Sequence, residues 1–272
     1  MHAASRDALK NVTESLWGIL DEGGQLVARA SQAGSELFEV ANFLDRNRDV
    51  RVALGDQAAP VDQRLQLVRQ LFGGKVSDAA MAILEKIASS NWSTTGELRQ
   101  GIVTVARRAL LQSAQSQDQL ATVEDELFRL SRLLESEPKL TRLLADKNTD
   151  ADRRRGLLAQ VLYGKVSAVT EALALQVIDR PEKNPIEDMA TLAGEAARAA
   201  GKSIATVTSA QELNDQQREN LAAKLRTIYG TDVSIHTEVD TSLLGGMIVR
   251  VGDEVIDGST AGKLQKLRVA LA

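Results

Sequence analysis

Two short segments of this sequence carry residue types that could do chemistry. The first is Gly201-Lys202-Ser203, which has the ending of a phosphate-binding loop. Such a loop needs another glycine five residues before Gly201, where this chain has Ala196, and it must follow a strand and precede a helix. Here a helical pattern comes before the segment and a strand pattern after it. We therefore interpret Gly201 as the end of a helix, with Lys202 at the negative end of the helix dipole.

The second segment is an acidic cluster near the end of the sequence, formed by Asp253, Glu254 and Asp257. Grouped carboxylates occur at metal sites and in acid–base catalysis, but no histidine lies nearby in the sequence. Gly252-Asp253 is a common pair in a tight hairpin turn, and Asp257 followed by Ser259 is typical of a strand that ends before a helix N-cap. We predict turn and capping roles here, and no catalytic, metal-binding or cofactor-binding residue in the chain.

Histidine and arginine add no catalytic arrangement. His2 is terminal. His236 lies in an alternating strand pattern, which does not show on which face of the strand it lies. No serine–histidine–acid set can be argued from these positions. The arginine run at 153–155 favours a solvated helix start, and binding to an acidic partner surface is the alternative.

Composition limits the class of protein. The chain has 272 residues, of which 43% are hydrophobic and 26% charged, so it should bury a core. A net charge of −4 and 3% aromatic residues argue against nucleic acid as a partner. The absence of cysteine excludes disulfides and thiolate sites and fits a reducing cytoplasm. We find no apolar run long enough to span a membrane and no signal-peptide pattern at the start.

An internal repeat organises most of the chain. The segment that begins at Glu36 matches the one that begins at Glu126 without a gap, an offset of 90 residues. Between 36–87 and 126–177, 15 of 52 positions are identical. This period is much longer than the 20–50 residues of solenoid repeats. It indicates a duplicated helical domain, with a first copy around 36–87 and a second around 126–177.

Each copy shows the same succession of helices and turns. We expect a helix through Leu37, a turn region, a second helix that ends at Gly74 and a third that begins after Ser77. The same pattern recurs 90 residues later. Asp62 and its counterpart Asp152 are predicted to cap the second helix of each copy.

The pattern of apolar residues changes after Gly201. Strand patterns at 203–210 and 232–240 flank a helix with Leu221, Leu225 and Ile228 on one face. A hairpin and a final helix complete the segment. We therefore predict a mostly α protein with two tandem helical bundles, 1–93 and 94–201, followed by a small α+β module, 202–272. The helical segment 94–111 could close the first bundle and open the second.

The end of the chain resembles the C-terminal signature of the delta subunit family of bacterial ATP synthase, the family of the oligomycin-sensitivity-conferring protein. That signature has a leucine and a glycine pair, an alternating strand, Val-Gly-Asp, Val-Ile-Asp-Gly-Ser and a basic helix with leucines. The matching residues are Leu244, Gly245, Gly246, Val251, Gly252, Asp253, Val255, Ile256, Asp257, Gly258, Ser259, Leu264 and Leu267. The resemblance is strong over 203–272 and looser over 94–201. Common members carry a single bundle, so the duplication leaves open which copy makes the usual contacts, and we favour the second.

The resemblance implies a structural part without catalysis. It implies a peripheral-stalk (stator) subunit of the proton-translocating ATP synthase, in a hetero-oligomeric complex at the cytoplasmic face of the cell membrane. The helical bundle would grip the N-terminal helices of the alpha subunits, and the C-terminal module would meet the b subunits. No cofactor, nucleic acid or membrane insertion is implied. The signature residues Gly245, Gly246, Gly252, Asp253, Asp257, Gly258 and Ser259 would give that module its shape.

Two other functions remain as alternatives. The leucine and alanine stripes also suit a general adaptor that binds helices of unrelated partners. A nucleotide- or metal-using enzyme built on 201–203 or 253–257 is the less favoured alternative.

Overall fold

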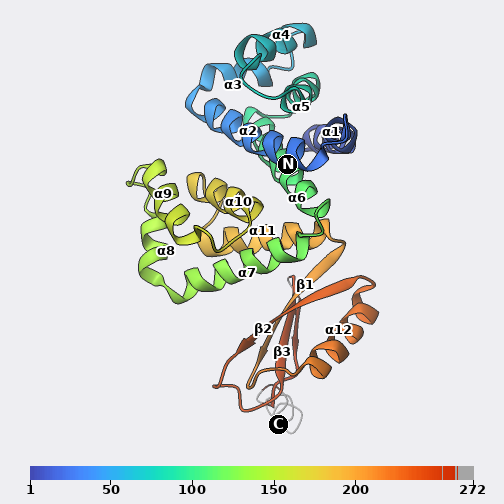
Figure 1. Cartoon of the computed structure of the whole chain (residues 1–272), viewed down its shortest axis with the longest axis vertical. Helices are drawn as coiled ribbons and strands as arrows, with labels where there is room; N and C mark the ends of the chain where they lie inside the picture. Colours follow the sequence, from blue (N-terminus) through green and yellow to red (C-terminus); the bar gives the residue numbers. More distant parts are fainter. Residues whose placement is uncertain (253, 261, 263–272) are drawn as a thin grey trace, which may run out of the picture. The chain divides into compact units, whose positions relative to one another are not determined.

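A computed structural model describes residues 1–252, 254–260 and 262. The expected architecture is confirmed, because helices fill most of the chain and a small mixed sheet lies near its end (Figure 1). The chain divides into two compact units, Met1–Leu192 (the N-terminal unit) and Ala193–Ala272 (the C-terminal unit). The three segments expected from the sequence stay a prediction, because both helical bundles contribute to the first unit. Among the described helices, none is long and apolar enough to cross a membrane.

The N-terminal unit consists of helices joined by short connections. Their bounds are α1 (Ala3–Asp21), α2 (Leu26–Arg46), α3 (Arg48–Gly55), α4 (Val61–Phe72), α5 (Asp78–Ser89), α6 (Thr95–Gln115), α7 (Leu120–Ser136), α8 (Pro138–Ala145), α9 (Ala151–Leu162), α10 (Ala168–Asp179) and α11 (Pro185–Ala199), the last of which continues into the C-terminal unit. The bounds of α3, α4 and α5 recur 90 residues later as those of α8, α9 and α10. Helices α2–α5 thus form the first copy, and α7–α10 form the second.

The same side chains begin the equivalent helices of the two copies. Ser77 is the N-cap of α5 and Ser167 that of α10, as predicted. The Glu36 carboxylate of α2 accepts hydrogen bonds from the Ser77 amide at 2.8 Å and hydroxyl at 2.6 Å, and Glu126 of α7 does the same for Ser167. A glutamate therefore fixes the start of the third helix of each copy against the first.

Two details of the sequence prediction were wrong. Asp62 and Asp152 do not cap α4 and α9; they lie inside the first turn, and Pro60 and Asp150 occupy the N-cap positions. The short helices α3 and α8 were not predicted as separate elements. The chain leaves helical geometry for one residue before each of them, and Pro138 then starts α8, where its missing N–H costs nothing.

Helix α6 lies between the two copies and buries most of its surface, apart from a more exposed stripe formed by Gln100, Thr104, Arg108 and Gln112. It packs against α1, α2, α3 and α5 of the first half and against α7 and α10 of the second copy. Its buried residues are Leu98, Arg99, Gly101, Ile102, Val103, Val105, Ala106, Arg107, Ala109, Leu110, Leu111, Ser113 and Ala114. An apolar surface this wide needs neighbouring helices on several sides. Helix α6 therefore completes the first bundle and begins the second.

The C-terminal unit holds a four-stranded sheet, and helix α12 packs on it. Its elements are β1 (Lys202–Ser209), α12 (Asp215–Tyr229), β2 (Asp232–Val239), β3 (Met247–Val251) and β4 (Glu254–Asp257), in the sheet order β2-β1-β3-β4. Strand β2 is parallel to β1, and β3 and β4 are antiparallel to their neighbours. The core contains Ala205, Val207 and Val249 from the sheet and Leu225 from α12.

One residue predicted on the buried face of α12 lies outside it. Ile228 is 63% exposed, whereas Tyr229 packs against the core, four positions after Leu225. A spacing of four keeps two side chains on the same helix face. The predicted final helix falls outside the described residues, except that Thr260 and Gly262 are helical.

The close contact between Gly101 and Trp92 gives a test of this packing. A Cβ on Gly101 would lie 2.2 Å from the ring of Trp92, which is 1% exposed. We expect Gly101→Ala to lower the free energy of unfolding by about 1–3 kcal/mol, because the buried indole must move. Gly18→Ala is the matched control, since Gly18 lies in α1 with nothing within 4 Å. It should raise stability by about 0.5–1 kcal/mol. Chemical denaturation measures both, and equal effects would contradict the packing.

Candidate interaction surfaces

The glycine pair of the C-terminal signature lies against the backbone that follows β4. Gly246 has φ +78°, and a Cβ there would lie 2.4 Å from the carbonyl oxygen of Gly258. The Gly258 amide donates to the Met247 carbonyl at 3.0 Å, and the Thr260 amide donates to that of Gly245 at 2.9 Å. The two segments thus continue the β3–β4 ladder at a distance that leaves no room for a side chain. The role of the glycine pair is therefore to allow this backbone conformation and close approach.

The remaining signature residues lie at the turn and at the end of β4. Gly252 has φ +58° and follows β3, where the register pairs Val251 with Glu254 across a two-residue turn. Asp253 lies outside the described residues. The Asp257 carboxylate accepts a hydrogen bond from the Ser259 amide at 2.9 Å, and the Ser259 hydroxyl accepts one from the Gly262 amide at 3.0 Å. These are the contacts of a strand exit and a helix start.

The segments considered for nucleotide or metal chemistry take other geometries. Gly201 has φ +70° and ends a helical segment, and β1 begins at the next residue. That order is the reverse of a phosphate-binding loop. Glu254 accepts a hydrogen bond from the Tyr229 hydroxyl at 2.7 Å, which raises the pKa of Tyr229. Across the described residues, no group of three or more acidic or histidine side chains could hold a metal ion.

His236, whose face the sequence left open, lies on the side of the sheet opposite the α12 core. Its neighbour Ile235 pairs with the buried Ala205 and packs against that core, while His236 pairs with Thr206 on the other side. Arg250 and Val255 continue this row across β3 and β4. The row mixes histidine, hydroxyl, guanidinium and apolar groups.

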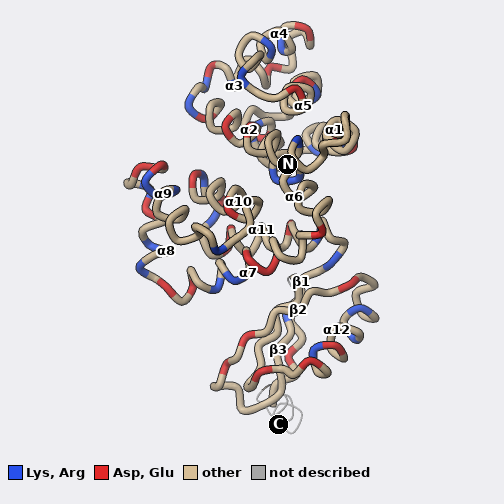
Figure 2. The backbone as a smooth tube through the Cα atoms, in the orientation of Figure 1, with Lys and Arg blue, Asp and Glu red and all other residues tan. Residues whose placement is uncertain are grey.

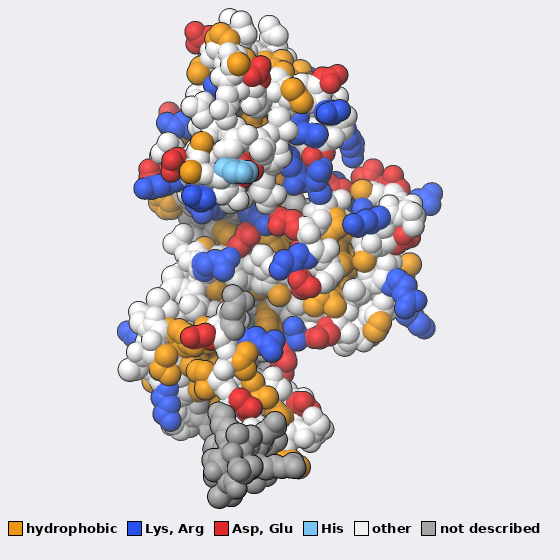
Figure 3. Space-filling view, turned by 180° about the vertical axis from the view of Figure 1, so that it is seen from behind, with side chains coloured by type: hydrophobic (Ala, Val, Ile, Leu, Met, Phe, Trp, Pro, Cys, Tyr) orange, Lys and Arg blue, Asp and Glu red, His pale blue; other side chains and the backbone are white. Residues whose placement is uncertain are grey.

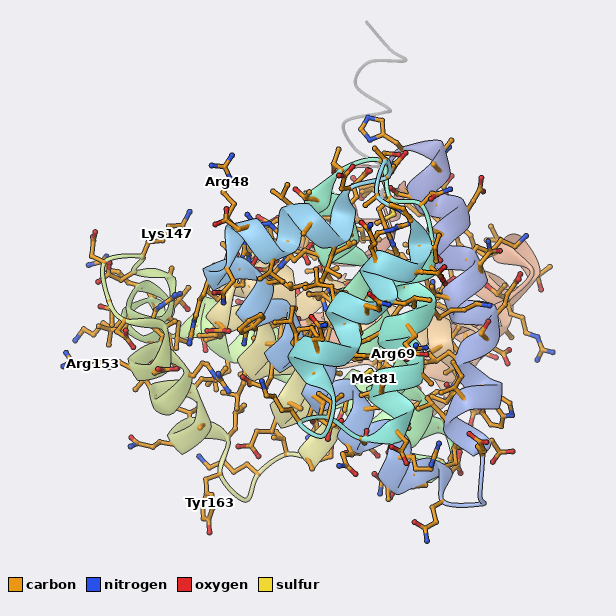
Figure 4. All side chains as sticks on the ribbon, turned by 90° about the horizontal axis from the view of Figure 1, so that it is seen from above. Arg48, Arg69, Met81, Lys147, Arg153 and Tyr163 are labelled. Carbon is orange, nitrogen blue, oxygen red and sulfur yellow. The ribbon has the colours of Figure 1, made fainter. Side chains whose placement is uncertain are left out.

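The three arginines at 153–155 have three different environments. Arg153 is exposed and points away from α9 (Figure 4). Arg154 is buried and donates to the carbonyl oxygens of Ile178 at 3.0 Å and Leu144 at 3.3 Å. Arg155 is half-buried and lies 4.0 Å from Glu39 of α2. Charges of both signs are interspersed along α9 (Figure 2). Only Arg153 fits the solvated helix start predicted for the run.

A network of charges around the buried Arg99 and Arg107 joins the two copies, and sequence reasoning missed it. Asp45 of α2 pairs with Arg99 of α6 at 3.1 Å and with Arg180, which follows α10. Arg107 of α6 donates to Gln176 at 3.0 Å. Burial lowers the pKa values of Arg99 and Arg180, and the Glu182 carboxylate offsets part of this for Arg99. The network ties α2 of the first copy to α10 of the second.

The repeat itself contained a signal for this network. At an offset of 90 residues, Arg99 and Arg107 correspond to Met189 and Ala197 in the other copy. Arg180 corresponds to Ser90. A charge that the duplication does not repeat marks a position whose surroundings differ between the copies, and here that difference is the contact between them.

Large apolar side chains are exposed on the C-terminal unit. In the view of Figure 3, hydrophobic side chains gather over this unit. The exposed ones among the described residues are Ile228, Val239, Leu244, Val255 and Ile256, and Leu244 is 80% exposed. Exposed large apolar side chains are candidates for contacts with a partner protein.

Comparisons with known proteins place these features in one family. The family model described as ATP synthase delta (OSCP) subunit matches residues 106–271. The chain is 57% identical over 272 residues to the ATP synthase subunit delta of Corynebacterium efficiens, covering 100% of this chain and 99% of that protein. It is 56% identical to those of Corynebacterium aurimucosum and Corynebacterium diphtheriae, with 100% of both chains covered.

A solved structure also matches in part. It is a chain of the Toxoplasma gondii mitochondrial ATP synthase hexamer, 19% identical, with a TM-score of 0.37. The match covers 61% of this chain and 94% of that one. A TM-score this low supports no structural argument.

The position of Gly246 predicts that a methyl group there disrupts the C-terminal unit. We expect Gly246→Ala to speed amide hydrogen exchange in β1, β3 and β4, because the Cβ meets backbone atoms that cannot move aside. Exchange in α2 and α6 should stay as in the wild type. Gly74→Ala is the control, since Gly74 has φ +69° with open space around it and should cost only about 1 kcal/mol. Unchanged exchange in the sheet would contradict the close approach.

Proposed function

This chain belongs to the ATP synthase delta (OSCP) subunit family, and we propose that its two units bind different subunits of that enzyme. As a delta subunit it is a structural, non-catalytic part of the peripheral stalk. In the proposal, the N-terminal unit binds the N-terminal helices of the alpha subunits on the catalytic head. The C-terminal unit binds the b subunits, at the cytoplasmic face of the cell membrane.

The division of the chain into two compact units with different surfaces supports this proposal. A stator must hold two separate structures in place against the torque of the rotor. Rotation of the rotor, driven by protons, can then drive ATP synthesis. Two compact units on one chain meet that requirement, because each can offer its own binding surface. Leu244 and Ile256 are exposed on the C-terminal unit and offer apolar side chains to the b subunits.

A double substitution in that surface tests the proposal. We expect Leu244→Asp with Ile256→Asp to release the catalytic head from membranes reconstituted with the variant, because carboxylates cannot be buried unpaired. ATP hydrolysis in the membrane and supernatant fractions measures the release. The released head should hydrolyse ATP at the rate of the wild-type head, since this subunit takes no part in the chemistry.

The same variant carries its own control. It should bind the isolated head with the affinity of the wild-type chain, because the N-terminal unit is unchanged. Retention of the head on the membrane would refute the proposed b-subunit surface. Equal loss of binding to the isolated head would contradict the assignment of one partner to each unit. If the chain were instead a general helix adaptor, the double substitution would affect neither the retention of the head on the membrane nor the binding to the isolated head.

A further inference from the structure

A groove between the two copies has no equivalent in a single bundle. It lies within the N-terminal unit, between α2 of the first copy and α9 and α10 of the second, and has a volume of about 280 Å³. Phe38, Ala172 and Leu175 form its apolar part. The groove exists because the two copies pack against each other, so it depends on the duplication.

Acidic side chains surround the apolar part. Glu39 of α2 and Glu171 and Asp179 of α10 line the groove, and Arg155 is the cation among its lining residues. Arg155 lies 4.0 Å from Glu39, so that pair is partly neutralised. The two carboxylates of α10 remain, and they give the groove a net negative charge.

The α10 carboxylates are available to a ligand. Within the described residues, the Glu171 and Asp179 side chains accept no hydrogen bond and make no ion pair, although the charge of Asp179 acts on Arg99 from a distance. The equivalent face of the first copy differs. Glu85 there is paired with Arg69 at 2.6 Å, and Met81 stands in place of Glu171. Figure 4 shows Arg69 and Met81 together on that face.

We propose that this groove binds an amphipathic helix of a partner protein, in which an apolar side chain lies between two basic residues seven or eight positions apart. Glu171 and Asp179 are eight residues apart on α10, which corresponds to roughly 12 Å along the helix axis. Residues spaced by seven or eight lie on one face of a partner helix, and a residue three or four positions from each lies between them. The apolar side chain enters the groove at Ala172 and Leu175, and the two cations meet Glu171 and Asp179.

The inference goes beyond the proposed function, because it adds a contact that a single-bundle delta subunit cannot make. It does not depend on which unit binds the alpha or the b subunits.

A designed peptide tests the proposed chemistry with the full-length chain. The probe is a fluorescein-labelled, alanine-rich helix with two lysines seven residues apart and leucines between them, and its partner probe has glutamates in place of the lysines. Fluorescence anisotropy should show binding of the lysine peptide and little binding of the glutamate peptide. Added salt should weaken the binding. Equal binding of the two peptides, or none, would overturn the proposal.

Charge reversal on α10 then locates the site. Glu171→Lys with Asp179→Lys should weaken binding of the lysine peptide at least about tenfold, from the loss of two ion pairs and the repulsion that replaces them. Glu171→Gln with Asp179→Asn is the milder version and should give a smaller loss in the same direction. The matched control is Asp7→Lys with Glu14→Lys on α1, exposed acids seven residues apart that should leave the affinity unchanged. An equal loss with the α1 pair would reject the groove.

The assembled enzyme tests whether a partner uses the groove. The chain has no cysteine, so Ala172→Cys provides a single site for a photo-crosslinker. In the reconstituted ATP synthase, we expect a crosslink that mass spectrometry maps to a helix with the predicted spacing of basic and apolar residues. A crosslink to a segment without that spacing, or none at all, would overturn the proposal. Neither result changes the test of the b-subunit surface.

Discussion

The N-terminal unit depends on one constraint, the burial of α6 between the two copies. Helices of both copies cover its apolar surface, so α6 cannot be assigned to one bundle. Its contacts with α1, α2 and α5 complete the first bundle, and those with α7 and α10 begin the second. Leu110 lies against Gly34 of α2 in the first copy, while Arg107 donates to Gln176 of α10 in the second. The duplicated region therefore behaves as one compact unit, which suits a part that must transmit force.

The duplication repeats the backbone but not the charges. Three features recur at an offset of 90 residues. They are the glycines in left-handed conformation at helix ends, the serine N-caps, and the glutamates that accept hydrogen bonds from those serines. Asp45, Arg99 and Arg180 gather instead at the contact between the copies. Removing Asp45 would leave the buried Arg99 guanidinium without that carboxylate, which costs more than the pair contributes. The network thus makes the contact between the copies specific, while the apolar packing around α6 supplies most of its stability.

Much of the fold followed from the sequence, because it rests on local rules. The stripe spacing predicted the long helices, Ser77 and Ser167 marked helix starts, and the alternation after Gly201 predicted the strands. Local rules failed where tertiary contacts decide. Asp62 has the residue type of an N-cap, but α4 already begins at Val61. Ile228 fits the apolar spacing of α12, but Tyr229 packs against the core instead. The groove and the Asp45 network bring together residues more than 100 positions apart, which no local pattern contains.

The same distinction explains what the resemblance to a family could and could not reveal. The C-terminal signature is recognisable because the backbone geometry requires glycine. Gly246 faces the Gly258 carbonyl at a distance that excludes any side chain. A groove between α2 and α10 arises only when two bundles lie side by side, so a single bundle has no α2 of another copy opposite Glu171. Its chemistry follows from which carboxylates the packing leaves without a partner, and that is a property of the folded chain rather than of any motif.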